Sequence, residues 1–115
     1  MTAIPKTKPA RDEKYRRLIA TMPCFSCGID GYSQAAHSNL AKHGKGGAQK
    51  ASDYATFPLC CERPGVMGCH SMFDQGLIVT KLNKETITDF WVNSAQTRAK
   101  QAGFSFPEGV CCEQE

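Results

Sequence analysis

The chain has 115 residues, a formal net charge of +3, seven cysteines and 41% apolar residues. This length suits a single domain with a modest core, which would gain stability from a structural ion. Met1 to Arg17 is polar and basic, and no stretch approaches the roughly 20 apolar residues that span a bilayer, so we expect neither a secretory leader nor a membrane contact. The expected compartment is the cytoplasm, where clustered cysteines more often bind metal than form disulfides.

The first half of the chain carries the positive charge. Residues 1–50 contain nine Lys or Arg and three acidic residues, whereas residues 51–115 contain five and eight. Basic groups of this kind bind phosphates without sequence preference, although the N-terminal group could equally be a solvated tail. The two groups are Lys6, Lys8, Arg11, Lys14, Arg16 and Arg17, followed by Lys42, His43, Lys45 and Lys50.

Residues 1–10 are expected to form a flexible basic arm before a single domain at 11–103. Within the domain, residues 11–22 predict a helix that Pro23 ends, because apolar side chains recur at helical spacing. These side chains are Tyr15, Leu18, Ile19 and Met22.

The middle of the chain predicts two short strands and a short helix. Residues 34–38 and 55–60 are expected to pair across a glycine-rich turn, and residues 71–75 predict a helix that Gly76 ends. A further short strand is expected at 77–82.

The last predicted element is a packing helix over residues 84–102, with Gly103 as its terminator and Trp91 in the core. Residues 104–115 show no clear pattern and are assigned to a tail. The side chains expected along the helix are Ile87, Phe90, Trp91, Ser94, Ala95 and Arg98.

Two separated cysteine clusters indicate one zinc site. Cys24 and Cys27 have knuckle spacing, and Cys60 and Cys69 could complete a tetrahedral thiolate set. The alternatives are buried thiols without metal, or Cys61 in place of Cys60. The remaining cysteines, Cys61, Cys111 and Cys112, are expected to be spare.

His70 and Asp74 are spaced i, i+4, which places them on one helical face where they could hold a second, harder ion. The alternatives are a surface pair without metal, or His70 as a zinc ligand in place of a cysteine. His37 is flanked by small residues and could also be an ordinary hydrogen-bonded strand histidine.

Five segments in fixed order carry a family resemblance. They are Pro23-Cys24-Phe25-Ser26-Cys27-Gly28, Ala35-Ala36-His37, Lys50-Ala51-Ser52-Asp53, Pro58-Leu59-Cys60 and Gly68-Cys69-His70-Ser71-Met72-Phe73-Asp74-Gln75-Gly76. Over roughly residues 20 to 80 the chain resembles HNH endonucleases of the ββα-metal superfamily. More narrowly, it is similar to phage-borne Ref-type recombination-enhancing nucleases and their prophage relatives.

The resemblance implies roles for individual residues. His37 stands where the family places its general base, and an imidazole is available in its neutral form at cytosolic pH. His70 and Asp74 would hold Mg²⁺, Mn²⁺ or a similar divalent ion. Cleavage would leave 5′-phosphate and 3′-hydroxyl ends, and the cell would be a bacterial host.

Three positions depart from the family pattern. Ala36 replaces a metal ligand that many members have directly before the base. The middle Asn is absent, and Asp53 is the nearest candidate, either as a third metal ligand or as the group that holds His37 in its productive tautomer. Eight residues separate Cys60 from Cys69, so residues 61–68 must loop out.

The sequence therefore predicts a small α+β domain, built as a zinc-stapled ββα-metal core with an N-terminal helix and a C-terminal packing helix. The expected activity is that of a DNA endonuclease or nickase, whose partners are DNA and, from the resemblance, a recombinase-coated strand. DNA contacts are expected from Arg16, Arg17 and the residues 42–50. The rival hypotheses are a zinc-stapled nucleic-acid-binding module without hydrolytic activity and, less favoured, a zinc-dependent protein-interaction domain.

Overall fold

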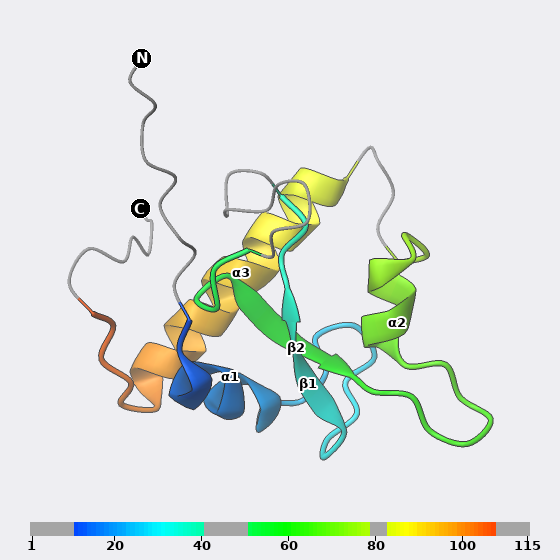
Figure 1. Cartoon of the computed structure of the whole chain (residues 1–115), viewed down its shortest axis with the longest axis horizontal. Coiled ribbons are helices and arrows are strands. Elements are labelled where there is room, and N and C mark those ends of the chain that lie inside the picture. Colours follow the sequence, from blue (N-terminus) through cyan, green and yellow to red (C-terminus); the bar gives the residue numbers. More distant parts are fainter. Residues whose placement is uncertain (1–10, 41–50, 79–82, 108–115) are drawn as a thin grey trace.

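The computed structural model describes residues 11–40, 51–78 and 83–107. Within them the chain forms an α+β fold with a two-stranded sheet and three helices, in agreement with the predicted class (Figure 1). The elements in chain order are α1 (Glu13–Ala20), β1 (Ser33–His37), β2 (Thr56–Cys60), α2 (Cys69–Asp74) and α3 (Lys84–Gln101).

Helix α1 begins at an aspartate cap. The side chain of Asp12 accepts a hydrogen bond from the backbone N–H of Tyr15 at 3.1 Å, which satisfies one of the donors left open in the first turn. Tyr15 and Ile19 are buried, as the apolar spacing predicts. The helix ends two residues earlier than expected, with Thr21 as its C-cap.

Strands β1 and β2 pair in antiparallel register, from Ser33 opposite Cys60 to His37 opposite Thr56. All five residues of β2 are buried, because helices cover it from several sides. Pro58 is tolerated within β2 because, among the described residues, β2 pairs with β1 alone. Its carbonyl accepts a hydrogen bond from the backbone of Phe25 at 2.9 Å, which places the first cysteine pair beside β2.

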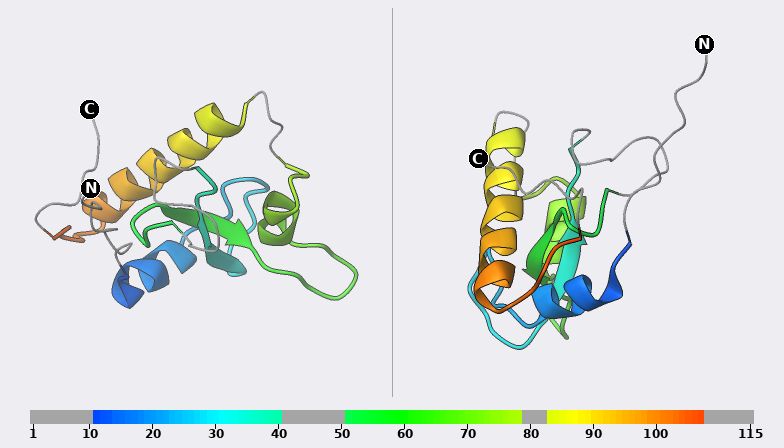
Figure 2. Two further views of the ribbon diagram at one scale, coloured as in Figure 1. Left: turned by 45° about the horizontal axis from the view of Figure 1, so that its top comes forward. Right: turned by 90° about the vertical axis from the view of Figure 1, so that its left-hand side faces the viewer.

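The helices enclose the sheet and make the core. Helix α1 packs against both strands, α3 packs against β2 and α1, and α2 packs against β2 (Figure 2). One aromatic group joins β2, α2 and α3, where Phe57 lies 5.3 Å from both Phe73 and Trp91 between ring centroids. The expected packing role of Trp91 is therefore observed.

A second aromatic group extends past the expected end of the domain. Phe104 and Phe106 lie 5.1 and 5.3 Å from the ring of Tyr15, and both also contact Tyr54. The residues after α3, up to Phe106, therefore pack against the core beside α1.

Two later elements differ from their predicted ranges. Helix α2 begins at Cys69 rather than at residue 71, so Cys69 and His70 both lie within the helix. The two described residues of the expected strand at 77–82, Leu77 and Ile78, lie in a bend, and the rest of that range is outside the described residues.

One large apolar side chain of α3 lies on the exposed side of the helix. Phe90 is 65% exposed, whereas the face turned to the core carries mostly small or polar residues. Gln96 is buried because its side-chain N–H donates to the carbonyl of Tyr54 at 2.7 Å, a long-range contact that apolar periodicity cannot indicate. The buried residues of α3 are Thr88, Val92, Ala95, Gln96 and Ala99.

The assignment of this face predicts a contrast between two substitutions. Val92→Ala removes two methyl groups from a site that is 3% exposed, so the free energy of unfolding should fall by roughly 1–3 kcal/mol. Phe90→Ala removes a larger side chain from the surface and should change the same free energy by less than about 0.5 kcal/mol. Urea unfolding measures both, and a larger loss for Phe90→Ala would contradict the assigned face.

Candidate zinc centre and histidine site

The first half of the cysteine cluster is a tight turn over residues 24–28. The backbone N–H of Gly28 donates to the carbonyl of Cys24 at 2.9 Å, and Gly28 has φ of +82°, a conformation that favours glycine. The backbone N–H groups of Ser26 and Cys27 both point at Cys24 Sγ, at 3.4 Å. Such donors stabilise the thiolate form of Cys24, which is the form that binds a metal cation.

The second half joins the end of β2 to the start of α2. Cys60 is the last residue of β2, Cys69 is the first of α2, and the backbone N–H of Cys69 lies 3.3 Å from Cys60 Sγ. The intervening residues loop out as expected, in a turn closed by hydrogen bonds between Arg63 and Val66. Gly68 permits the return, since a Cβ there would lie 2.4 Å from the backbone of Cys61.

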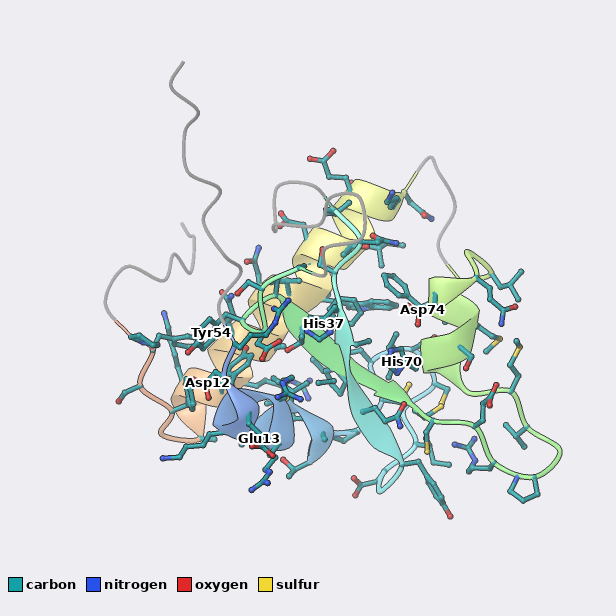
Figure 3. The ribbon with its side chains drawn as sticks, viewed as in Figure 1. Asp12, Glu13, His37, Tyr54, His70 and Asp74 are labelled. Atoms are coloured by element: carbon teal, nitrogen blue, oxygen red, sulfur yellow. The ribbon has the colours of Figure 1, made fainter. Side chains whose placement is uncertain are left out.

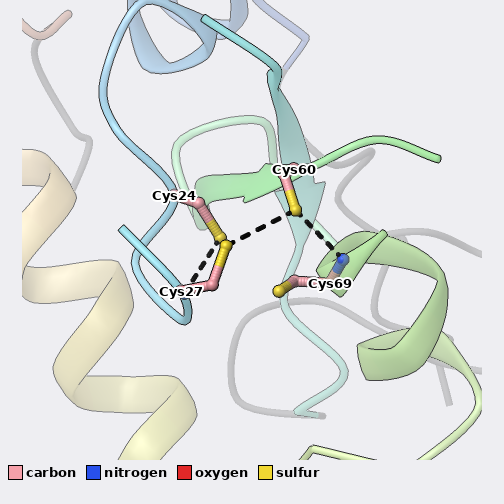
Figure 4. A group of neighbouring side chains, drawn as sticks. All are labelled: Cys24, Cys27, Cys60 and Cys69. Carbon is pink, nitrogen blue, oxygen red and sulfur yellow. Dashed lines mark hydrogen bonds between the residues drawn. The ribbon is translucent and has the colours of Figure 1, made fainter. Parts of the chain in front are cut away.

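The four predicted cysteines converge on one point (Figure 4). Their sulfur atoms all lie within 4.8 Å of one another, and Cys27 Sγ is 3.8 Å from Cys60 Sγ. Tetrahedral zinc with Zn–S distances of about 2.3 Å separates its ligand sulfurs by about 3.8 Å. The cluster can therefore hold a metal ion such as zinc, and it uses Cys60 rather than Cys61.

The crowded thiols differ in acidity. Burial raises the pKa of Cys60, but the backbone N–H of Cys69 and the guanidinium of Arg63 outweigh it, and the net pKa falls to about 6. Burial raises the pKa of Cys69 to about 12. Cys60 is therefore more acidic than Cys69, and binding of zinc by Cys69 must release the proton of that thiol.

Arg63 lies at the edge of this cluster. Its guanidinium carbon lies 4.8 Å from the ring centroid of Tyr32, and Nη1 donates to the carbonyl of Cys61 at 3.2 Å. A cation held in this way offsets part of the negative charge of a four-thiolate site.

Zinc content gives a direct test of the cluster. The purified chain should contain about one zinc, and Cys24→Ser should lose that zinc together with cooperative thermal unfolding, because the ion connects three segments of a small core. Elemental analysis and a thermal melt measure the two effects. Cys61→Ser is the matched control and should keep both properties. A wild-type chain without zinc, or a folded Cys24→Ser variant with full zinc, would contradict the assignment.

The second group of interest begins with His37 at the end of β1. Its Nε2 lies 2.8 Å from Oδ1 of Asp53, which lies in the turn before β2. Asp53 is 1% exposed, whereas the His37 side chain is 21% exposed. The hydrogen bond to a buried carboxylate fixes the orientation of the partly exposed His37 ring.

Helix α1 provides the other partners of Asp53. Oδ2 accepts from the backbone N–H of Asp12 at 2.7 Å and from Nε of Arg16 at 2.8 Å, while Nη1 of Arg11 lies 3.5 Å from Oδ1. Burial acts to raise the pKa of Asp53, but the hydrogen bonds from His37, Asp12 and Arg16 outweigh it, so the pKa is lowered. Asp53 is therefore held as a carboxylate.

The N-terminal end of α1 makes a second contact with the turn before β2, through Tyr54. The hydroxyl of Tyr54 donates to Oδ2 of Asp12, whose other oxygen caps α1. Burial and this hydrogen bond raise the pKa of Tyr54 to about 12, so the hydroxyl keeps its proton and remains a donor. Residues 53 and 54 thus both bind the first turn of α1.

His70 and Asp74 form the expected pair on α2. Nε2 of His70 lies 3.6 Å from Oδ2 of Asp74, and Nδ1 of His70 lies 2.9 Å from Oε1 of Gln34 on β1. The amide oxygen of Gln34 makes Nδ1 the donor, which leaves the Nε2 lone pair directed toward Asp74. These two ligand atoms are close enough to share one cation.

Strand β1 therefore connects the two histidine sites: it ends in His37, and its Gln34 contacts His70. Gln34 binds His70 and His37 binds Asp53, so the two contacts start three residues apart on one strand, about 10 Å along its length. In the view of Figure 3, His37 lies between Asp12 and Tyr54 on one side and the α2 pair on the other.

Several other predicted site residues can now be placed. Arg16 is engaged with Asp53, and Arg17 is exposed and paired with Glu13 at 2.6 Å. Lys42, His43, Lys45 and Lys50 lie outside the described residues. Ala36 is fully buried, and the four cysteines are the one group of three or more potential ligands that gather among the described residues. Asp53 contacts His37 at 2.8 Å, which corresponds to the second of the two roles considered for it.

Sequence analysis missed Gln34, Asp12 and Arg63 as parts of these sites. Gln34 lies 36 residues from His70, and Asp12 lies 41 residues from Asp53, so no local pattern links the partners. The Asp at residue 12, directly before the first predicted helix, is the one signal available, because aspartate is a preferred cap.

The lowered pKa of Asp53 predicts an acid-sensitive contribution to stability. Its folded-state pKa lies below the ordinary 3.8, so the contribution is complete above pH 3.8 and is lost as pH falls through the folded-state pKa. Asp53→Asn should therefore lower the free energy of unfolding by roughly 1–3 kcal/mol at pH 6, and this deficit should shrink below pH 3.8. Urea unfolding from pH 6 to 3 measures it; a deficit that grows with acidity would be the opposite result.

Comparisons with protein families, with curated proteins and with solved structures find no match for this chain. Among the described residues, no helix has the length and apolar character needed to cross a membrane.

Proposed function

We propose that this chain is a metal-dependent DNA endonuclease or nickase of the HNH type, with a zinc-stapled ββα-metal core. The order of elements supports the proposal, because an antiparallel strand pair is followed directly by a short helix, with one histidine ending β1 and a second on α2. The observation that carries it is the 2.8 Å contact between His37 and the buried carboxylate of Asp53.

That contact assigns a role to each nitrogen of His37. Asp53 accepts from Nε2, which then carries the proton of the neutral imidazole, and the lone pair resides on Nδ1. His37 would take the proton of an attacking water through this lone pair. Because Asp53 is held as a carboxylate, it would also stabilise the imidazolium that forms.

The α2 pair would serve the phosphate. His70 Nε2 and the Asp74 carboxylate would hold a divalent ion, Mg²⁺ or Mn²⁺, with Gln34 fixing the ring of His70. When bound, such an ion supplies charge stabilisation to the phosphate and to the leaving oxygen. The four-thiolate zinc would have a separate, structural role: it holds Cys69, which is the neighbour of His70 on α2.

The DNA contacts belong to the same proposal. Arg17 is 75% exposed on α1, and the basic residues 42–50 follow β1 in the chain. They would bind phosphates by charge, so little sequence preference is expected. The prophage link, the recombinase-coated strand and a cytoplasmic site of action rest on the family resemblance alone.

One observation favours the rival function, a zinc-stapled nucleic-acid-binding module without hydrolysis. Ala36 supplies no ligand beside His37, and the described residues bring only two ligand side chains together on α2. A protein of this kind would bind DNA and keep its zinc but leave every phosphodiester intact.

Plasmid nicking separates the two functions. With Mg²⁺ or Mn²⁺ the zinc-loaded chain should nick supercoiled DNA, and His37→Ala should slow nicking by about 10²–10⁴-fold, because the base is lost. Asp74→Asn should raise the Mn²⁺ concentration needed for half-maximal rate.

The control for both variants is unchanged zinc content and thermal unfolding. DNA binding without cleavage of duplex, single-stranded or branched DNA by the wild type, across divalent ions, would establish the rival function. Full activity of His37→Ala would also refute the proposed mechanism.

A further inference from the structure

Helix α1 lies outside the segments that resemble the nuclease family, yet it contacts the base site. Two of its N-terminal residues bind the same oxygen of Asp53: the backbone N–H of Asp12 at 2.7 Å and Nε of Arg16 at 2.8 Å. The other oxygen is left to His37, at 2.8 Å, with Arg11 at 3.5 Å. One oxygen of the carboxylate therefore binds the start of α1, and the other binds His37.

This division has an electrostatic consequence for His37. A buried carboxylate beside an imidazole favours the protonated imidazolium, which is useless as a base. A guanidinium on the far oxygen opposes that effect, because it neutralises the carboxylate and disfavours a second positive charge nearby. Among the described residues, the charged groups at this site are Asp53, Arg16 and Arg11, with Asp12 behind them bonded to Tyr54.

We propose that Arg16 is a positioning residue that keeps His37 a neutral, Nε2-protonated imidazole, by sharing the Asp53 carboxylate with it. The proposal rests on the proposed function for its purpose, since a neutral imidazole is what a base requires. Its physical content concerns the contacts of Asp53 with His37 and Arg16, and it can be measured without any cleavage reaction.

Arg17 provides a matched control for Arg16. Both are arginines of α1, adjacent in sequence, and loss of either removes one positive charge. Arg16 is 42% exposed and bonded to Asp53, whereas Arg17 is 75% exposed and bonded to Glu13. A general effect of net charge would therefore appear in both variants, and the effect of the Asp53 contact in only one.

The experiment is a titration of the histidine ring nitrogens by long-range ¹H–¹⁵N correlation NMR. It uses the full zinc-loaded chain without added divalent ion, and the His37 signals are assigned by their loss in His37→Gln. In the wild type, neutral His37 should carry its proton on Nε2. Arg16→Ala should move the His37 midpoint to higher pH by at least about 0.5 units, since the carboxylate is no longer neutralised.

Two further variants test the direction of the effect. Asp53→Asn should move the midpoint to lower pH and weaken the preference for the Nε2 proton, because the anion is gone. Arg16→Lys keeps a charge of the same sign and should return the midpoint toward the wild-type value. Arg17→Ala should move it by less than about 0.2 units, as expected for an exposed and screened charge.

Equal shifts in Arg16→Ala and Arg17→Ala, or a wild-type proton on Nδ1, would overturn the inference. A chain that gives the expected titrations but cleaves no DNA would keep this inference and lose the proposed function. An active nuclease whose His37 midpoint is unchanged in Arg16→Ala would keep the function and lose the inference. In an active enzyme with the expected titrations, the acid limb of the pH–rate profile should shift to higher pH in Arg16→Ala.

Discussion

The buried carboxylate of Asp53 is the interaction on which the histidine site depends. At 1% exposure it cannot remain charged without partners, and it has them from two segments: β1 through His37, and the start of α1 through Asp12 and Arg16. The same bonds that stabilise the charge also fix the orientation of the imidazole. The contacts that stabilise the fold here therefore also orient the ring of His37.

The cysteine cluster connects separate segments at the opposite end of the strand pair, where Ser33 pairs with Cys60. It joins the turn at residues 24–28, the end of β2 and the first residue of α2, which are far apart in sequence. Because His70 follows Cys69 directly, the ion that stabilises the fold would also set the position of the α2 pair. Gln34 then links that pair back to β1.

Local sequence patterns predicted what depends on near neighbours. The spacing of Cys24 and Cys27, the two short strands expected at residues 34–38 and 55–60, and the apolar stripe of Tyr15 and Ile19 all correspond to observed structure. The exposure of Phe90 could not be predicted from the spacing along α3, because small residues and a satisfied Gln96 occupy the core side. The contact of Asp53 with His37 was one of the two roles considered for Asp53, but its partners at the start of α1 could not be predicted, since Arg16 and Asp12 lie 37 and 41 residues away.

The central claim is that His37 and the His70–Asp74 pair serve one phosphate, and a crystal structure of the zinc-loaded chain soaked with Mn²⁺ tests it most directly. Anomalous scattering locates the ion without assumptions about its ligands. We expect manganese bound by His70 Nε2 and the Asp74 carboxylate, with Nδ1 of His37 facing it across a space that a phosphate would fill. Manganese absent from α2, or an imidazole at residue 37 turned away from a bound ion, would show that the two groups do not act on one phosphate.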